Sequence, residues 1–176
     1  MIGLFLFFGA ALLLAVALKV IFTPRSAKKV VMSSNPIDGI RFGGVMGFML
    51  GDSYEFCLSR FKHLDIAIDY QDKTGDNSMI MGWGKNQYNN INAVRFIFEQ
   101  KKLASIVIDV DFSKEGIRDM YGILISRICR ILKTEPMMSD SKQTAWASPK
   151  SGIILFKRFV PISGDEILLI QIGSMS

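Results

Sequence analysis

The first 22 residues form an apolar stretch that is long enough to cross a lipid bilayer. From Ile2 to Leu18 the chain has no charged, amide or hydroxyl side chain, and only Lys19 interrupts the run before Phe22. About 20 apolar residues in a helix span the roughly 30 Å hydrocarbon core of a bilayer, and a lysine near one end reaches the headgroups. The sequence therefore predicts a transmembrane helix over residues 1–22. Its expected lipid-facing residues are Leu4, Phe5, Phe8, Leu12, Leu13 and Val16.

The excess of basic residues lies next to this stretch. Lys19, Arg25, Lys28 and Lys29 are the only charged side chains before residue 30. Of the 21 basic residues, 17 follow residue 29, against 16 acidic residues. A nearly neutral domain lacks the clustered basic surface that nucleic-acid binding requires, so we expect no nucleic-acid partner. Cations beside a membrane helix instead contact anionic headgroups, so the four residues predict lipid contact.

Two interpretations of the apolar stretch remain open. No Lys or Arg precedes it, so the positive-inside rule places the N-terminus outside and the following domain in the cytoplasm. Alternatively, Ala15-Val16-Ala17 matches a signal-peptide cleavage site, and cleavage would release an exported soluble binding protein. The basic n-region of a signal peptide is missing. We therefore favour a retained single-pass anchor and, by a smaller margin, a cytoplasmic domain.

The rest of the chain predicts one α+β domain. Residues 23–39 contain two prolines, three serines and no apolar periodicity, which is typical of a linker. We expect the domain over residues 40–173 and a short tail at 174–176, since about 137 residues suffice for one hydrophobic core. The two cysteines, Cys57 and Cys129, share apolar helix faces and are expected in the core.

Periodicity within the domain predicts two helices and an antiparallel sheet. Asp52 and Glu55 have capping-box spacing before a helix that ends near Leu64, and Ser113 precedes a second helix over about 114–133. Expected strands lie at 64–70, 79–83, 144–147, 153–160 and 166–172, and residues 93–112 form a hairpin that turns near 100–102. The pattern of one helix followed by a strand meander occurs twice, as in a duplicated unit. Both helices would cover one face of a curved sheet.

At this level the chain resembles small modules of the β-lactamase-inhibitor-protein-like and SmpA-like kind. The resemblance is carried by Phe42-Gly43-Gly44, by Leu50-Gly51-Asp52-Ser53 before the first helix, and by Trp146 in a strand after the second helix. It implies protein binding or envelope assembly and carries over no catalytic residue. The chain departs from such modules in lacking a lipid-attachment cysteine after the apolar stretch.

Residues with catalytic or ligand-binding chemistry have simpler structural explanations. His63, the only histidine, falls at a helix end, where its positive charge complements the helix dipole. Asp69, Asp72, Asp76 and Asn77 miss the spacing of an EF-hand loop. The glycines of 43–47 and 82–84 match neither phosphate-binding motif and are expected in bends. We therefore predict no catalytic residue, metal or cofactor.

The sequence favours a membrane-anchored, non-enzymatic protein-interaction domain, such as a subunit or accessory of a membrane or envelope assembly. Trp83, Tyr88 and Trp146 are candidates for its partner surface, although each could equally cover the core. One alternative is a membrane-bound, cation-dependent hydrolase that uses the carboxylates of Asp65, Asp69, Asp109 and Asp111.

Overall fold

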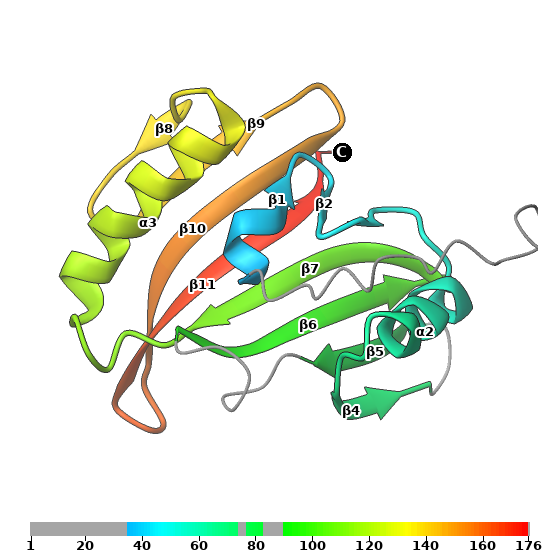
Figure 1. Ribbon diagram of the computed structural model, residues 1–176. Helices are drawn as coiled ribbons and strands as arrows, with labels where there is room; N and C mark the ends of the chain where they lie inside the picture. Colours follow the sequence, from blue (N-terminus) through cyan, green and yellow to red (C-terminus); the bar gives the residue numbers. More distant parts are fainter. Residues whose placement is uncertain (1–34, 74–76, 83–89, 176) are drawn as a thin grey trace, which may run out of the picture. The chain divides into compact units, whose positions relative to one another are not determined.

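The computed structural model describes residues 35–73, 77–82 and 90–175, all of which belong to one compact unit, Ser34–Ser176. This unit is α+β, with two α-helices and an antiparallel sheet, which confirms the predicted fold class (Figure 1). The predicted transmembrane helix at 1–22 lies outside the described residues. Among the residues that are described, no helix is both long and apolar enough to cross a bilayer.

The elements follow one another as a short meander, a helix with four strands, and a second helix with four strands. The 3-10 helix η1 (Pro36–Gly39) leads into a small sheet of β1 (Ile40–Arg41), β2 (Gly44–Val45) and β3 (Phe48–Met49). The first long unit comprises α2 (Tyr54–His63), β4 (Ile68–Asp72), β5 (Asn77–Gly82), β6 (Ile91–Glu99) and β7 (Lys102–Val110). The second comprises α3 (Ile117–Leu132), β8 (Met138–Ser139), β9 (Gln143–Ala147), β10 (Ser151–Val160) and β11 (Asp165–Ser174).

The two long units build one sheet with a mirrored strand order. Its eight strands run β4-β5-β6-β7-β11-β10-β9-β8, and all paired neighbours are antiparallel. The last strand of each unit lies at the centre and the first lies at an edge. This arrangement has the helix-plus-meander pattern that the sequence indicated, with four strands in each half.

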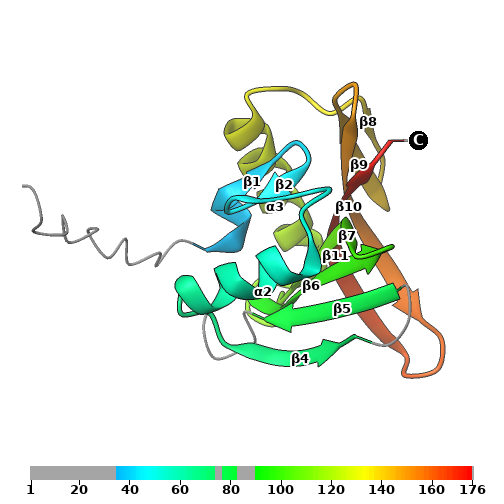
Figure 2. The same ribbon diagram turned by 90° about the vertical axis from the view of Figure 1, so that its right-hand side faces the viewer.

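Both helices lie on the same side of the sheet (Figure 2). The hydrophobic core lies between the helices and the sheet. Phe61 of α2 packs against Phe48 and Phe96 at ring-centroid distances of 5.0 and 5.1 Å, and these two rings lie 4.8 Å from each other. All three rings are buried. Gly82 permits this packing, because a Cβ there would lie 2.5 Å from the Phe61 ring. α3 buries Met120, Tyr121, Leu124 and Ile128.

The ends of α2 differ from the prediction because local side chains compete for the caps. Ser53, rather than Asp52, is the N-cap and accepts a hydrogen bond from Phe56 N at 3.2 Å. The Asp52 carboxylate instead accepts from Met49 N at 2.8 Å. After the helix, Asp65 has φ 56° and Ile66 N donates to Phe61 O, as in a Schellman termination. Residues 64–66 are thus used to end the helix, so the strand predicted from 64 begins at Ile68.

Helix α3 also begins later than its sequence suggests. Ser113 does not cap it, because Ser113 N is turned back to the Asp111 carboxylate at 3.0 Å. Gly116 has φ 79° and occupies the N-cap position without a side-chain bond, so the helix starts at Ile117. The hairpin of β6 and β7 agrees with the prediction, and its turn residues Gln100 and Lys101 both have positive φ, as a type I′ turn requires.

The predicted linker ends too late. Residues 36–39 were expected in the linker, but Pro36 and Ile37 are buried and belong to the folded unit. Asp38 contributes an ion pair to Arg127 of α3, with 2.7 Å between Oδ1 and Nη2. At the other end, Ser174 belongs to β11 and not to a tail. Only two side chains of this segment are buried and only one forms an ion pair. Its composition therefore looks like that of a linker, although it belongs to the folded unit.

Candidate functional site: the open face of the sheet

Within the part of the chain that the structure describes, both helices lie over one face of the eight-stranded sheet, and we call the other face the open face. The register aligns one residue from each strand in a single row across it: Tyr70, Met81, Arg95, Val107, Gln171, Ile154, Ala145 and Met138. A second row holds Ala93, Asp109, Leu169, Phe156 and Gln143. A third row includes Met79, Ile97, Ser105 and Gly173.

The open face is apolar to an unusual degree for a solvent-facing sheet. Antiparallel sheets with one covered face usually alternate apolar residues with polar ones. Here the outward positions include Val107, Leu169, Phe156 and Ile154. Ile154 is 39% exposed and Phe156 is half-buried, whereas Val107 and Leu169 keep only 9% and 8% of their surface exposed. Contiguous apolar surface of this kind is a recurrent feature of protein-binding sites. A partner that covers this face therefore removes water from few polar groups.

The charged groups at the centre of this face neutralise each other. Arg95 Nη2 lies 3.1 Å from Asp109 Oδ2, and Asn92 Nδ2 donates to the other carboxylate oxygen at 3.1 Å. The Asp109 side chain is 17% exposed. Asn92 Oδ1 is buried and accepts no hydrogen bond from the described residues. The Arg95–Asp109 pair therefore adds no net charge to the open face.

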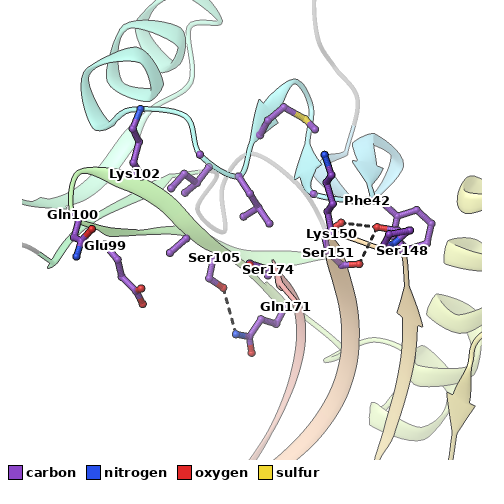
Figure 3. Close-up of a pocket in the computed structure, with 18 of the residues that line it drawn as sticks. Phe42, Glu99, Gln100, Lys102, Ser105, Ser148, Lys150, Ser151, Gln171 and Ser174 are labelled. Atoms are coloured by element: carbon purple, nitrogen blue, oxygen red, sulfur yellow. Dashed lines mark hydrogen bonds between the residues drawn. The ribbon is translucent and has the colours of Figure 1, made fainter. Parts of the chain in front are cut away.

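A groove of about 1420 Å³ borders the open face where β7 begins and β11 ends (Figure 3). Ser105 and Gln171 belong to both the face and the groove, and Gln171 Nε2 lies 3.4 Å from Ser105 Oγ. The opposite wall comes from Phe42, Gly43, Met49, Leu50 and Gly51, and a third side comes from the turn Ser148–Ser151. The groove is therefore formed by segments that lie far apart in the sequence, and Asn77 of β5 also lines it.

The chemistry of the groove suits hydrogen bonding to a protein chain. Ser148 and Ser151 share a hydroxyl contact of 3.0 Å, and Ser148 Oγ also donates to Ser151 O. Lys102 and Lys150 supply two ammonium groups and Glu99 one carboxylate. Figure 3 shows Glu99 and Lys102 at one end of the groove and Lys150 at the other. Hydroxyl and amide side chains adapt to many partners, whereas dispersed charges define no small-molecule subsite.

A smaller hollow of about 520 Å³ lies at the β9 and β10 end of the open face. Ile154 and Phe156 belong to it and to the open face, and its charged members include Lys142, Arg158 and Asp140. The Asp140 carboxylate accepts hydrogen bonds from Lys142 N at 2.6 Å and Gln143 N at 2.8 Å. These bonds hold the pKa of Asp140 below its usual value of 3.8. Asp140 therefore fixes the strand turn and stays ionised at neutral pH.

The tryptophan and tyrosine candidates fall in two groups. Trp146 is 1% exposed on the helix-covered side of β9, opposite Ile153 in the register, so it cannot form part of a partner surface. Its alternative role as core cover agrees with this burial. Trp83 and Tyr88 lie outside the described residues, as do the predicted anchor positions and Lys19, Arg25, Lys28 and Lys29.

The carboxylates that an enzyme would need are dispersed. Asp109 is paired with Arg95, Asp111 binds Ser113 N, and Asp65 occupies the C-terminal turn of α2. None of them lines the groove. Within residues 35–73, 77–82 and 90–175, no group of three His, Cys, Asp or Glu side chains is placed to hold a metal ion. His63 is the last residue of α2, as expected.

The cysteines are both free thiols, and only one is fully buried. Cys57 lies on the buried side of α2 and has no exposed surface, and this burial raises its pKa to about 12. Cys129 is half-buried on α3, with its sulfur 3.9 Å from a Glu135 carboxylate oxygen. The expectation of two buried cysteines is therefore confirmed for Cys57 and wrong for Cys129.

The open face was missed at the sequence level, although a signal for it exists. The segments Ile106–Ile108 and Ile167–Ile170 are continuous apolar runs and not alternating ones. Such runs are typical of strands with apolar residues on both faces. In an antiparallel sheet with helices on one face, the second apolar face can then bind another molecule. Comparison with protein-family models, with curated proteins and with solved structures gives no match.

Proposed function

We propose that this protein is a membrane-tethered, non-enzymatic protein-interaction domain. In this proposal residues 1–22 anchor the chain and the basic residues that follow contact the lipid headgroups. The folded unit binds a protein partner through its open face, as a subunit or accessory of a membrane assembly. The partner is expected to bring a largely apolar and uncharged surface. The basic residues Arg25, Lys28 and Lys29, which follow the apolar stretch, support a cytoplasmic position for the folded unit.

The observation that carries the proposal is the apolar open face with its internally neutralised centre. The Arg95 and Asp109 side chains satisfy each other, so a partner need not supply a countercharge. Burial of the surrounding aliphatic and aromatic side chains favours association at about 25 cal/mol per Å² before the costs of ordering are subtracted.

The binding test uses the full chain in its native membranes. A photo-reactive amino acid replaces Ile154 on the open face or, as the control, Ile123 on α3, which is 48% exposed. The proposal expects one protein adduct of defined mass from position 154 and none from position 123. Replacing Phe156 by Lys in the first variant should abolish the adduct without lowering the melting temperature. Adducts from both positions, or from neither, would contradict the proposed face.

The tether is tested separately by extraction of the membranes with alkaline carbonate. A retained helix over residues 1–22 keeps the full chain in the pellet, whereas a cleaved signal peptide releases a shortened chain. Protease accessibility in intact cells then reports the side of the membrane. Protection from external protease is the expected result, and digestion would place the domain outside.

A further inference from the structure

The hairpin of β10 and β11 extends beyond the rest of the sheet. β9 pairs with β10 only as far as Phe156, and β7 pairs with β11 only from Leu168 onward. Among the described strands, none therefore pairs with the outer side of Arg158↔Ile167, Phe159↔Glu166 or Val160↔Asp165. Figures 1 and 2 show this two-stranded ribbon projecting past the ends of the adjacent strands.

The end of the ribbon is apolar and exposed. Phe159 is 58% exposed and Ile162 is 100% exposed. Residues 159–164 read Phe-Val-Pro-Ile-Ser-Gly and contain no charge. We call this segment the hairpin tip. Charged residues begin only at its base, where Arg158 on one strand is balanced by Asp165 and Glu166 on the other, with Lys157 behind them.

The tip does not stabilise the folded unit. A two-stranded ribbon without further packing is only marginally stable in water, and fully exposed Ile162 contributes no core contact. A turn of this length needs only residues that accept its backbone geometry, which Gly164 with φ 73° and Pro161 supply. The large apolar side chains at 159 and 162 therefore serve a contact outside the unit.

We propose that the hairpin tip inserts into the interfacial region of the bilayer, so that the domain contacts the membrane at a second point besides its anchor. This inference rests on the proposed tether, which keeps the domain near the lipid and raises the effective concentration of the tip at its surface. Apolar side chains on an uncharged turn partition into the boundary between headgroups and acyl chains.

The dimensions and charges of the ribbon agree with an interfacial contact. Three residue pairs at a rise of about 3.3 Å carry the tip roughly 10 Å beyond the neighbouring strands. The uncharged turn can therefore enter the interface while Arg158, Asp165 and Glu166 stay among the headgroups. The base of the ribbon is close to neutral, so its contact does not depend on anionic lipid. The linker cations Arg25, Lys28 and Lys29 would, in contrast, bind in a salt-sensitive manner.

The test measures fluorescence quenching in the full chain reconstituted into phosphatidylcholine vesicles with brominated acyl chains. Ile162→Trp places a probe at the tip. Met137→Trp places a matched probe at a position that is 68% exposed, in the connection between α3 and β8. After subtraction of the signal of the parent chain, the tip probe should lose fluorescence in brominated vesicles relative to unbrominated ones. The Met137→Trp probe should not change.

A second pair of variants guards against an effect of the new tryptophan itself. Phe159→Trp should also be quenched, and adding Ile162→Asp to it should abolish the quenching while carbonate extraction still finds the chain in the pellet. High salt should leave the quenching unchanged.

An anchored chain whose tip probe is not quenched overturns the hairpin contact and leaves the tether intact. A chain extracted by carbonate overturns the tether itself. A photo-reactive residue at 162 that yields a protein adduct in place of a lipid adduct assigns the tip to a partner protein and also overturns the proposal.

Discussion

Both faces of the eight-stranded sheet carry apolar side chains, but their surroundings differ, and the open face also holds polar residues such as Arg95, Asp109 and Gln171. On the covered face, Ile153 and Ile170 have no exposed surface because α2 and α3 lie over this side. On the other face, Ile154 and Phe156 of β10 are also large apolar residues but border a hollow. Apolar character thus does not distinguish core from surface in this sheet. Only the presence of the helices does, and the open face is the one on which a second molecule can take their role.

The consecutive isoleucines of β10 provide the sharpest way to break this comparison. Ile153→Ala removes packing from the core and should cost about 2–5 kcal/mol of unfolding free energy. Ile154→Ala, one residue later on the open face, should cost less than about 1 kcal/mol, because little of the side chain is enclosed. Denaturant unfolding of the full chain in detergent measures both. Equal losses would mean that the open face is already part of a core.

The Arg95–Asp109 pair tests what the open face gains from its polar centre. Arg95→Ala leaves the Asp109 carboxylate largely enclosed without its cation and should cost roughly 1–3 kcal/mol of unfolding free energy. The double variant Arg95→Met with Asp109→Leu should recover much of that loss, since apolar replacement of an enclosed pair is often tolerated. Urea midpoints of the three proteins decide. A double variant as unstable as the single one would contradict the proposed desolvation cost.

A smaller effect is expected at the start of α2, one of the two helices that distinguish the faces. Ser53→Ala removes the N-cap acceptor and should lower the unfolding free energy by about 1 kcal/mol. Asp52→Ala is the neighbouring control, since its carboxylate bonds to Met49 N outside the helix and does not cap it. Thermal unfolding with helical circular dichroism compares them. If Asp52→Ala alone reduces helicity, the capping assignment is wrong.

The smallest expected effect is a pH dependence at the edge of the open face. The folded unit holds the pKa of Asp140 below 3.8, so its ionised form favours folding at higher pH, and this contribution disappears as the pH falls through the lowered folded-state pKa. Asp140→Ala should therefore be less stable than the parent at pH 7, and the difference should shrink below about pH 3.8. A difference independent of pH would assign the effect to packing.

Much of the fold followed from periodicity, and the errors have local causes. The strands at 93–110 and 153–172 were predictable because Val94, Phe96 and Phe98 alternate and because a short turn separates each pair. Helix ends were less predictable, since Ser53 and Asp52 are both good caps and only the Met49 contact decides between them. The candidate site was harder still. Whether Trp146 faces helices or solvent depends on strand register and helix placement, which arise from contacts distant in sequence.

The mirrored strand order has a consequence for synthesis on the ribosome. At the centre of the sheet β7 pairs with β11. Residues 105–110 therefore gain their second neighbouring strand, after β6, only when residues 168–173 have emerged. Until then, the completed first half exposes one unpaired strand edge in the middle of the future sheet, with hydrophobic side chains above and below it. Such an edge favours wrong association between nascent chains and slows folding. We therefore expect the first half, up to Val110, to depend on chaperone binding while the second half is being translated.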